Sequence, residues 1–452
     1  MTHRFTSRAV AAGLLASALA ACATTAFPRP AEPPALRRLV IMLDGVPHHV
    51  MDSLWQAGRF QTFNAPARMI SPFPSLTGVA FREIWRTPVT NGYEDRYFDR
   101  DRNQVAGGFL DHVFNAAEHA GFQRMVDLKP GSFSAGLAYL VPMTMARHEL
   151  NGLRRKLRER MVWDTLIVAY FVSTDAIAHR APDELPGFLL EIERLVTDVR
   201  AVTRPDLDVV LFSDHGNDML PSRRVALESE LGDSGFRVND EIEDVRDVVL
   251  PRFGLVGSAF AYTSPGREAS LADVLRYVKG VDLVAFADSS GRAHVWTAGG
   301  RAVIEAGAGH DWFRYTPVEG DPLRLEAVLA RLRDSGEVDE TDAAPDSVWL
   351  RETMDTDFVD PLRRIVLGLH AVRNPADVLI SLAPGYHFGN ENADLFVDSR
   401  GTHGSLRTTS SLAFVMGTQV EVPDPIRSDD LQRFVSLPRQ PAGARDAGTH
   451  RQ

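Results

Sequence analysis

The stretch Leu39-Val40-Ile41-Met42-Leu43-Asp44-Gly45 decides the fold class of this 452-residue chain. Five consecutive apolar residues predict a strand buried on both faces, and the Asp-Gly pair marks a functional loop at its carboxyl end. Two further apolar runs, at residues 166–172 and 209–212, also lead into carboxylates, Asp175 and Asp214. Residues 378–382 and 412–416 are additional candidate strands.

A helix is predicted between two of these strands, because apolar residues recur there with a period of about 3.6. They are Phe188, Leu189, Ile192, Leu195, Val196 and Val199. Strands alternating with helices predict an α/β fold of three layers, helix-sheet-helix, around a largely parallel central sheet. Ligands of such sheets bind at the carboxyl ends of the strands, which is where the carboxylates fall.

The texture of the sequence changes between about residues 245 and 315, where short β-rich pieces alternate with Gly, Ser and Asp turns. We interpret residues 240–350 as an inserted β-rich cap on a globular domain that spans residues 36–420. Residues 421–452 are rich in Pro, Arg and Gly, and we expect a poorly ordered tail there.

The N-terminus predicts export and lipid anchoring. Arg4 and Arg8 precede an apolar run too short to span a bilayer, which is typical of a signal peptide over residues 1–21. The run ends in Leu19-Ala20-Ala21-Cys22, which resembles the lipobox of bacterial lipoproteins and implies acylation of Cys22, the only cysteine. Residues 22–35 would form a proline-rich tether. The alternative is an ordinary signal peptide with a chance cysteine.

If Cys22 is acylated, the protein is a membrane-bound lipoprotein of the periplasm. Ala23 is not aspartate, and this favours the outer membrane by the lipoprotein sorting pattern. The net charge of −11 would become −13 after loss of Arg4 and Arg8. Such an acidic surface argues against nonspecific binding of nucleic acid. An anionic substrate would therefore need local positive charge, which bound metal ions supply.

Six potential metal ligands follow the predicted strands. Asp175 and His179 are four residues apart, so a helix starting there would place both on one face. Asp and His side chains suit zinc, manganese or iron, and six donors make two sites of three ligands each. The six are Asp44, Asp175, His179, Asp214, His215 and His403. His387 is a rival to His403 as the last ligand.

Thr77 is the candidate nucleophile. It lies in Phe73-Pro74-Ser75-Leu76-Thr77 at the start of a predicted helix, whose unpaired N–H groups favour an alkoxide or a phosphate oxygen. Contact with a metal can deprotonate a hydroxyl that is otherwise a poor nucleophile. The alternative is that Ser75 or Thr77 only caps the helix.

These motifs, in order, resemble those of the alkaline phosphatase superfamily, and most closely the type I phosphodiesterase and nucleotide pyrophosphatase group. They run from Leu43-Asp44-Gly45 through the Thr77 motif to Gly401-Thr402-His403-Gly404. The resemblance implies that residues 36–420 form an alkaline phosphatase-like catalytic domain that hydrolyses phosphate esters. It also implies two divalent metals, normally zinc, and a phosphothreonine intermediate on Thr77.

The resemblance further divides the ligands between the two ions. Asp175, His179 and His403 would hold one, and Asp44, Asp214 and His215 the other, with Thr77 touching the second. One departure concerns the asparagine that binds a nonbridging phosphate oxygen in the phosphodiesterases. Here Arg96 falls near its place and Asn91 is the closest amide. Since arginine can clamp a more highly charged phosphate, a phosphomonoesterase remains an alternative, as does a noncatalytic, lipid-anchored binding protein.

Overall fold

The computed structural model describes residue 27 and residues 30–108, 121–131, 136–204, 206–390 and 399–436. The predicted signal peptide, Cys22 and residues 437–452 lie outside the described residues. Within the described residues, no helix combines the length and the apolar character needed to cross a membrane.

The central sheet confirms the predicted, largely parallel arrangement. β1 pairs in parallel with β5 on one side and with β6 on the other. β19 is the reversed strand, because it is antiparallel to both β6 and β2, whereas β20 is parallel to β2. In the part of the chain that the structure describes, the order is β20-β2-β19-β6-β1-β5, with β1 at Arg38–Leu43, β2 at Ala67–Ile70, β5 at Leu166–Phe171, β6 at Asp208–Ser213, β19 at Leu412–Gly417 and β20 at Ile426–Arg427.

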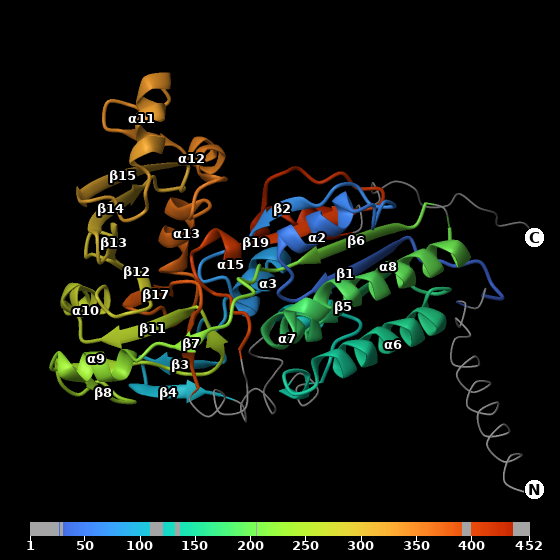
Figure 1. Cartoon of the computed structure of the whole chain (residues 1–452), viewed down its shortest axis with the longest axis horizontal. Coiled ribbons are helices and arrows are strands. Elements are labelled where there is room, and N and C mark those ends of the chain that lie inside the picture. The colour runs from blue at the N-terminus through green and yellow to red at the C-terminus, as the bar shows by residue number, and fades with distance from the viewer. Residues whose placement is uncertain are drawn as a thin grey trace, which may run out of the picture.

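Helices cover both faces of this sheet and make the predicted three layers (Figure 1). Leu39, Ile41 and Leu43 of β1 pack in one buried cluster with four helices, and Val40 and Met42 pack in another on the opposite face. This alternation explains why residues 39–43 of β1 are apolar without interruption. The first face is covered by α2 (His48–Gln56), α6 (Pro142–Arg160), α7 (Ser173–Arg180) and α8 (Leu185–Val202), and the second by α3 (Thr77–Trp85), η1 (Gly121–Met125) and α16 (Gln432–Val435).

A second sheet stands beside the central one (Figure 1). The β-rich pieces predicted between residues 245 and 315 are strands of this sheet. Residues 378–382, predicted as a strand from their apolar run, form β17, which pairs antiparallel with β11 and β12 here and not in the central sheet. Among the described residues its order is β16-β15-β14-β13-β12-β17-β11-β9-β8, with β8 at Arg237–Val238, β9 at Asp247–Val249, β11 at Ser258–Thr263, β12 at Val281–Ala287, β13 at Ala293–Thr297, β14 at Gly300–Ala306, β15 at Trp312–Glu319, β16 at Ala343–Pro345 and β17 at Val378–Leu382.

The described residues also form two short sheets and several helices outside the two main sheets. Two short sheets have the orders β10-β18-β7 and β3-β4 among the described residues. The remaining elements are β3 (Arg96–Asp99), β4 (Gln104–Gly107), η2 (Pro182–Glu184), β7 (Arg223–Arg224), α9 (Leu227–Asp233), β10 (Leu255–Val256), α10 (Glu268–Leu275), α11 (Glu326–Ser335), α12 (Asp346–Thr353), α13 (Pro361–Gly368), β18 (Tyr386–Gly389), α15 (Thr408–Ser411) and η3 (Ser428–Asp430).

The prediction of a poorly ordered tail from residue 421 is wrong for residues 421–436. Ile426 lies in β20 of the central sheet, and Leu431 and Val435 are fully buried against its second face. These apolar side chains lie singly among prolines and charged residues, so the sequence shows no apolar run or period that would indicate a buried element here.

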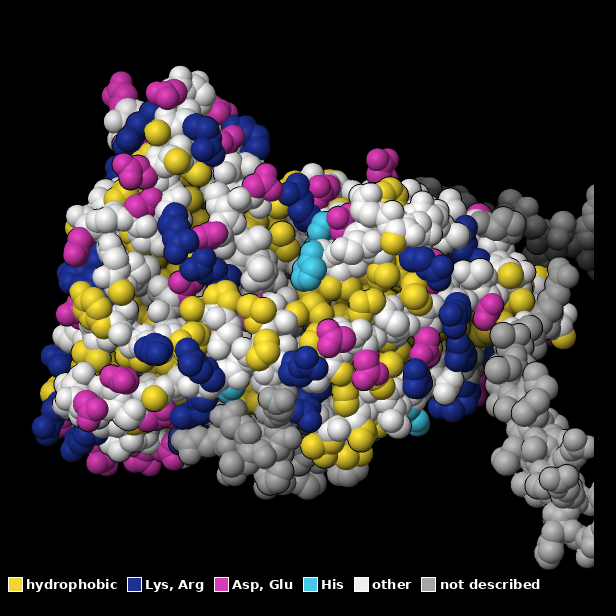
Figure 2. All heavy atoms as spheres, viewed as in Figure 1, with side chains coloured by type: hydrophobic (Ala, Val, Ile, Leu, Met, Phe, Trp, Pro, Cys, Tyr) yellow, Lys and Arg dark blue, Asp and Glu magenta, His cyan; other side chains and the backbone are white. Residues whose placement is uncertain are grey.

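The surface carries charges of both signs. On the face shown in Figure 2, Lys and Arg side chains are interspersed with Asp and Glu side chains and with apolar areas. This mixture is typical of a surface exposed to water.

Candidate active site

The carboxyl ends of β1, β5 and β6 lie level with one another at one edge of the central sheet. Leu43 at the end of β1 is in register with Phe171 of β5 and with Ser213 of β6. Asp44 and Asp214 immediately follow two of these ends, and Asp175 lies in the first turn of α7, which follows the third. The sheet therefore gathers three carboxylates that are distant in the sequence, as predicted for such an edge.

Gly45 permits this close approach. It has a φ of +66°, and a Cβ built on it would lie 2.4 Å from Asp175 Oδ1. Its backbone N–H donates a hydrogen bond to Asp214 Oδ1 over 3.2 Å. A residue with a side chain would therefore be strained in its backbone and would collide with a candidate ligand.

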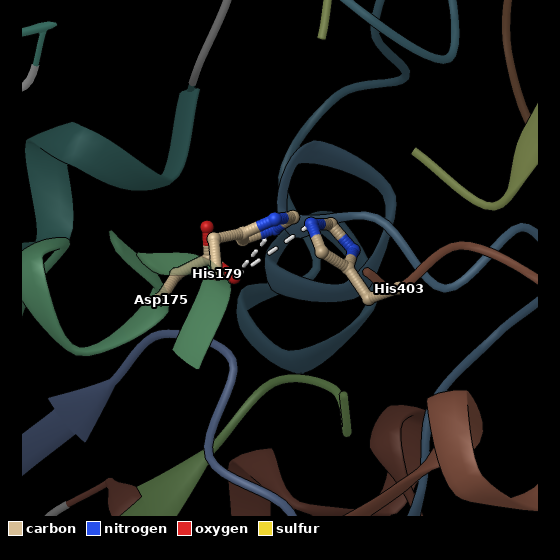
Figure 3. Close-up of side chains that lie close together, drawn as sticks. All are labelled: Asp175, His179 and His403. Atoms are coloured by element: carbon tan, nitrogen blue, oxygen red, sulfur yellow. Dashed lines mark ion pairs between the residues drawn. The ribbon is translucent and has the colours of Figure 1, made fainter. Parts of the chain in front are cut away.

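One candidate cation site consists of Asp175, His179 and His403. One donor atom from each lies within 4.8 Å of the others, and all three side chains are buried. His179 Nε2 is 3.4 Å and His403 Nε2 is 3.7 Å from Asp175 Oδ1. Figure 3 shows the three side chains pointing toward one another, with His403 coming from a loop and the other two from α7. The four-residue spacing of Asp175 and His179 on α7 thus places both side chains on one face of the helix, as predicted.

Backbone carbonyls orient two of the histidine rings. His403 Nδ1 is 2.9 Å from the carbonyl oxygen of Ser75, in the loop before Thr77. His215 Nδ1 is 2.9 Å from the carbonyl oxygen of Gly216. A proton on each Nδ1 would leave each Nε2 lone pair free for a cation, which is the usual arrangement of a metal-binding histidine.

A second group consists of Asp44, Asp175 and His215, whose donor atoms also lie within 4.8 Å of one another. His215 Nε2 is 3.3 Å from Asp44 Oδ1 and 3.5 Å from Asp214 Oδ2. Asp214 thus lies against this group as well. All six predicted ligands are buried and lie close together, and Asp175 belongs to both groups.

Thr77 lies beside the second group. Its Oγ1 is 3.2 Å from Asp44 Oδ1 and 3.2 Å from His215 Nε2. Thr77 is the first residue of α3, and no side chain caps that helix. The Ser75 hydroxyl instead donates to the carbonyl oxygen of Pro72. The alternative of a purely capping hydroxyl therefore does not describe this site.

The donor set fits divalent cations. Asp175 Oδ1 and Asp214 Oδ2 are buried and have no hydrogen-bond partner among the described residues. Buried carboxylate oxygens without a partner are costly, and a cation would satisfy them. His and Asp are ligands that zinc accepts readily.

Burial and mutual charge interactions shift the pKa values of several ionisable groups in the cluster. Burial, reinforced by the charge of Asp44, raises the pKa of Asp214 to about 7. Burial opposes the charged form of His215, but the carboxylates of Asp214 and Asp44 outweigh it and raise its pKa to about 10. Burial and the neighbouring His215 lower the pKa of His403 to about 3. A cation would favour deprotonation throughout the cluster.

Comparisons with known proteins give structural relatives. Neither a protein-family model nor a curated protein matches this chain. Solved structures similar to it include phosphonoacetate hydrolase from Sinorhizobium meliloti 1021, with 14% identity, a TM-score of 0.48, and coverage of 90% of this chain and 96% of that one. Human ectonucleotide pyrophosphatase/phosphodiesterase 5 has 11% identity, a TM-score of 0.46, and coverage of 88% and 94%. The murine protein has 10% identity, with the same TM-score and coverage.

Two tyrosines that were not predicted from the sequence donate hydrogen bonds to candidate ligand carboxylates. The Tyr139 hydroxyl donates to Asp175 Oδ2 over 2.6 Å, and the Tyr170 hydroxyl donates to Asp44 Oδ2. Each tyrosine occupies one carboxylate oxygen and leaves Oδ1 facing the cluster. Tyr170 is part of β5, and a phenol within an otherwise apolar strand was the only available signal.

The structure does not link the predicted substrate-binding residues, Arg96 and Asn91, to this network by a hydrogen bond or ion pair among the described residues. Arg96 begins β3, and its side chain makes no hydrogen bond or ion pair with the six ligands among the described residues. The backbone carbonyl of Asn91 accepts hydrogen bonds from Asn374. Their contact with substrate stays a prediction. His387, the rival ligand, lies on β18 with its Nδ1 2.8 Å from Ser222 Oγ and is absent from both groups.

Proposed function

We propose that this chain hydrolyses phosphate esters, using two divalent cations and Thr77 as the nucleophile. The observation that carries the proposal is the position of Thr77 Oγ1, 3.2 Å from both Asp44 Oδ1 and His215 Nε2 at the start of α3. A hydroxyl among metal donors, at a helix N-terminus that favours negative charge, is suited to attack phosphorus.

We assign the following roles to the residues of the site. Asp175, His179 and His403 would hold one cation, and Asp44, Asp214 and His215 the other, with zinc the metal that this donor set suits best. Two such ions, when bound, lower the pKa of a hydroxyl or water and stabilise the entering and leaving oxygens. The chain itself brings the donors together, orients His403 and His215, and places Thr77 against them.

The reaction would proceed in two displacements. Thr77 Oγ1 gives up its proton to water and bonds to phosphorus as the ester oxygen departs with its electron pair and takes up a proton from water, which gives a phosphothreonine and an alcohol. Water then forms a bond to phosphorus as the Oγ1–P bond breaks, so that Thr77 is regenerated and the second phosphate product is released. The unpaired N–H groups at the start of α3 would bind a nonbridging oxygen in both steps.

A substrate panel tests the proposal. Purified protein loaded with Zn²⁺ is mixed with a chromogenic phosphodiester and with the matching monoester, next to Thr77→Ala. We expect turnover of at least one ester and its loss in Thr77→Ala. Zn²⁺ binding without turnover above the variant would instead favour the noncatalytic binding protein.

The same panel addresses substrate preference. If Arg96 clamps the phosphate bidentately, Arg96→Ala should impair hydrolysis of monoesters more than that of diesters, because a monoester carries more charge. Equal impairment of both activities would contradict the clamp. Asn91→Ala would show whether the amide has the role of the asparagine in the phosphodiesterases.

We further propose that residues 1–21 are a signal peptide and that Cys22 anchors the enzyme to a membrane facing the periplasm. The motif Leu19-Ala20-Ala21-Cys22 supports this proposal. Detergent phase partitioning of the full chain tests it. The native protein should enter the detergent phase, and Cys22→Ser should remain in the aqueous phase. Equal partitioning of the two would contradict lipidation.

A further inference from the structure

Arg364 is a buried arginine at the junction of the two sheets. It lies on α13, which Figure 1 shows between the second sheet and the α3 region. Its side chain contacts two segments that carry active-site residues. Arg364 Nε is 2.8 Å from Ser71 O, Nη1 is 3.0 Å from Val359 O and 3.0 Å from Leu406 O, and Nη2 is 3.2 Å from Pro72 O, 3.1 Å from Ser75 Oγ and 2.6 Å from Ser411 Oγ.

The acceptors around this guanidinium are neutral. Five are carbonyl or hydroxyl oxygens of the segments 71–75 and 406–411, and within the described residues no carboxylate lies at ion-pair distance from Arg364. Burial lowers the pKa of Arg364 to about 10, so the group stays charged at neutral pH. Burying an unpaired cation is costly, and neutral acceptors compensate only when they converge with good geometry. Its neighbour Arg427 instead pairs with Asp360 and Asp346.

The two segments meet again at the site itself. The Ser75 carbonyl accepts the hydrogen bond that orients His403, and Thr77 follows two residues later. Ser411 and Leu406 belong to the segment that continues from His403. The Ser75 hydroxyl lies 3.4 Å from the Ser411 hydroxyl, so the segments also touch directly. Arg364 therefore fixes the loop of the nucleophile relative to the loop of a metal ligand.

We propose that Arg364 is a positioning residue that sets the distance between Thr77 and His403. This inference rests on the proposed function for its kinetic consequences, but not for its effect on metal binding. Arginine suits the role because its planar fork offers five N–H donors in fixed directions, whereas lysine offers three on a flexible stem. Conservative replacement by lysine should therefore keep the charge but lose the geometry.

The test compares Arg364→Lys with Arg363→Lys. Arg363 is adjacent on α13 but directs its guanidinium to Asp429 over 3.1 Å and to Asp346 over 3.8 Å. It is partly buried, with 19% of its side chain exposed, and so serves as a control for replacing a neighbouring arginine on the same helix. Both variants are titrated with Co²⁺, followed by visible absorbance, and both are assayed with the chromogenic ester that the wild type turns over best.

For Arg364→Lys we expect a fall of roughly 10- to 100-fold in Co²⁺ affinity at one of the two sites, because the orientation of His403 is lost. We expect kcat to fall about 100-fold with a much smaller change in KM, since a displacement of about 1 Å at the nucleophile has that effect. Arg363→Lys should stay within about twofold of the wild type, as a conservative change outside the network should. Equal Co²⁺ affinities and equal kcat values in the two variants would overturn the proposal.

Ser411→Ala keeps the proposal falsifiable if Arg364→Lys does not fold. It removes one acceptor, 2.6 Å from Nη2, without changing a charge. Like Arg364→Lys, it should lower both kcat and Co²⁺ affinity. An unchanged Co²⁺ titration would count against the role of Arg364. If the wild type turns over no ester, the proposed function fails, while the Co²⁺ titrations still decide whether Arg364 positions His403.

Discussion

Replacement of Tyr139 by phenylalanine isolates the contribution of one hydrogen bond to metal binding. The Tyr139 hydroxyl donates to Asp175 Oδ2 over 2.6 Å, a length typical of a bond to an ionised acceptor. Burial, aided by the negative charge of Asp175, raises the pKa of Tyr139 well above its usual value, so the hydroxyl keeps its proton. The bond therefore persists across the neutral range.

The size of the effect follows from the charge of the acceptor. Hydrogen bonds to charged groups contribute about 1.5–3 kcal/mol, and every 1.4 kcal/mol corresponds to about a tenfold change in affinity. Tyr139→Phe should therefore weaken Zn²⁺ binding roughly 10- to 100-fold, in agreement with the usual effect of groups that orient metal ligands. The loss arises because Asp175 Oδ1 is no longer held facing His179 and His403.

Competition with a chromogenic chelator measures the change, with Tyr262→Phe as the matched control. The Tyr262 hydroxyl donates to the carbonyl oxygen of Asn374 over 2.9 Å, in the second sheet and away from the ligands. Tyr262→Phe should lower thermal stability slightly but leave Zn²⁺ affinity unchanged. The idea under test is that Tyr139 leaves only Oδ1 of Asp175 for the cation. If Tyr139→Phe binds Zn²⁺ as tightly as the wild type, this idea is refuted. Tighter binding, with both carboxylate oxygens on the cation, would refute it as well.

Three further predictions follow from the geometry. Gly45→Ala should abolish tight Zn²⁺ binding in chelator titrations, because its Cβ would lie 2.4 Å from Asp175 Oδ1, whereas Gly58→Ala, at a similar φ of +79° but with no heavy atom within 4 Å, should cost only about 1–2 kcal/mol in urea unfolding. His403→Ala should lower the bound metal measured by elemental analysis to about one ion per chain, whereas His387→Ala should leave it unchanged; a loss in both would place His387 among the ligands. Burial raises the pKa of Glu149 from 4.5 to about 8, so the folded, metal-free protein retains a proton that the unfolded chain releases. Its stability should therefore fall as the pH rises through the window from 4.5 to 8, and Glu149→Gln should flatten this slope in urea unfolding of chelator-treated protein.

Local patterns explain what could be predicted from the sequence. The apolar run before Asp44 predicted a strand, and alternating burial in two separate clusters confirms that both its faces are covered. The spacing of Asp175 and His179 predicted a shared helix face, and the two side chains lie 3.4 Å apart. Thr77 was placed correctly at a helix start. Each of these inferences needed only neighbours in the sequence and the rule that parallel strands end at a common edge.

Long-range partners explain what could not be predicted. Tyr170 is 126 positions from Asp44, and Arg364 is 292 positions from Pro72. Nothing in the local sequence of either indicates its partner. The direction of a strand in its sheet could not be predicted either. The apolar run of β19 is compatible with parallel and with antiparallel pairing to β6, and the pairing is antiparallel. The run of β17 likewise did not show which of the two sheets it would join.

The second sheet contributes to the site more directly than an inserted cap would. Phe73 and Leu76, in the loop before Thr77, belong to one buried cluster with Phe260 and Leu379 of the second sheet. The N–H of Gly257, just before β11, donates to the carbonyl oxygen of His403, and a Cβ on Gly404 would lie 3.0 Å from Ser258 Oγ. A cap that only contacts substrate could vary without cost to the candidate metal ligands. Here the Thr77 loop and the His403 loop are packed against β11 on one side and bonded to α13 on the other, so the geometry of the candidate cation sites depends on both sheets.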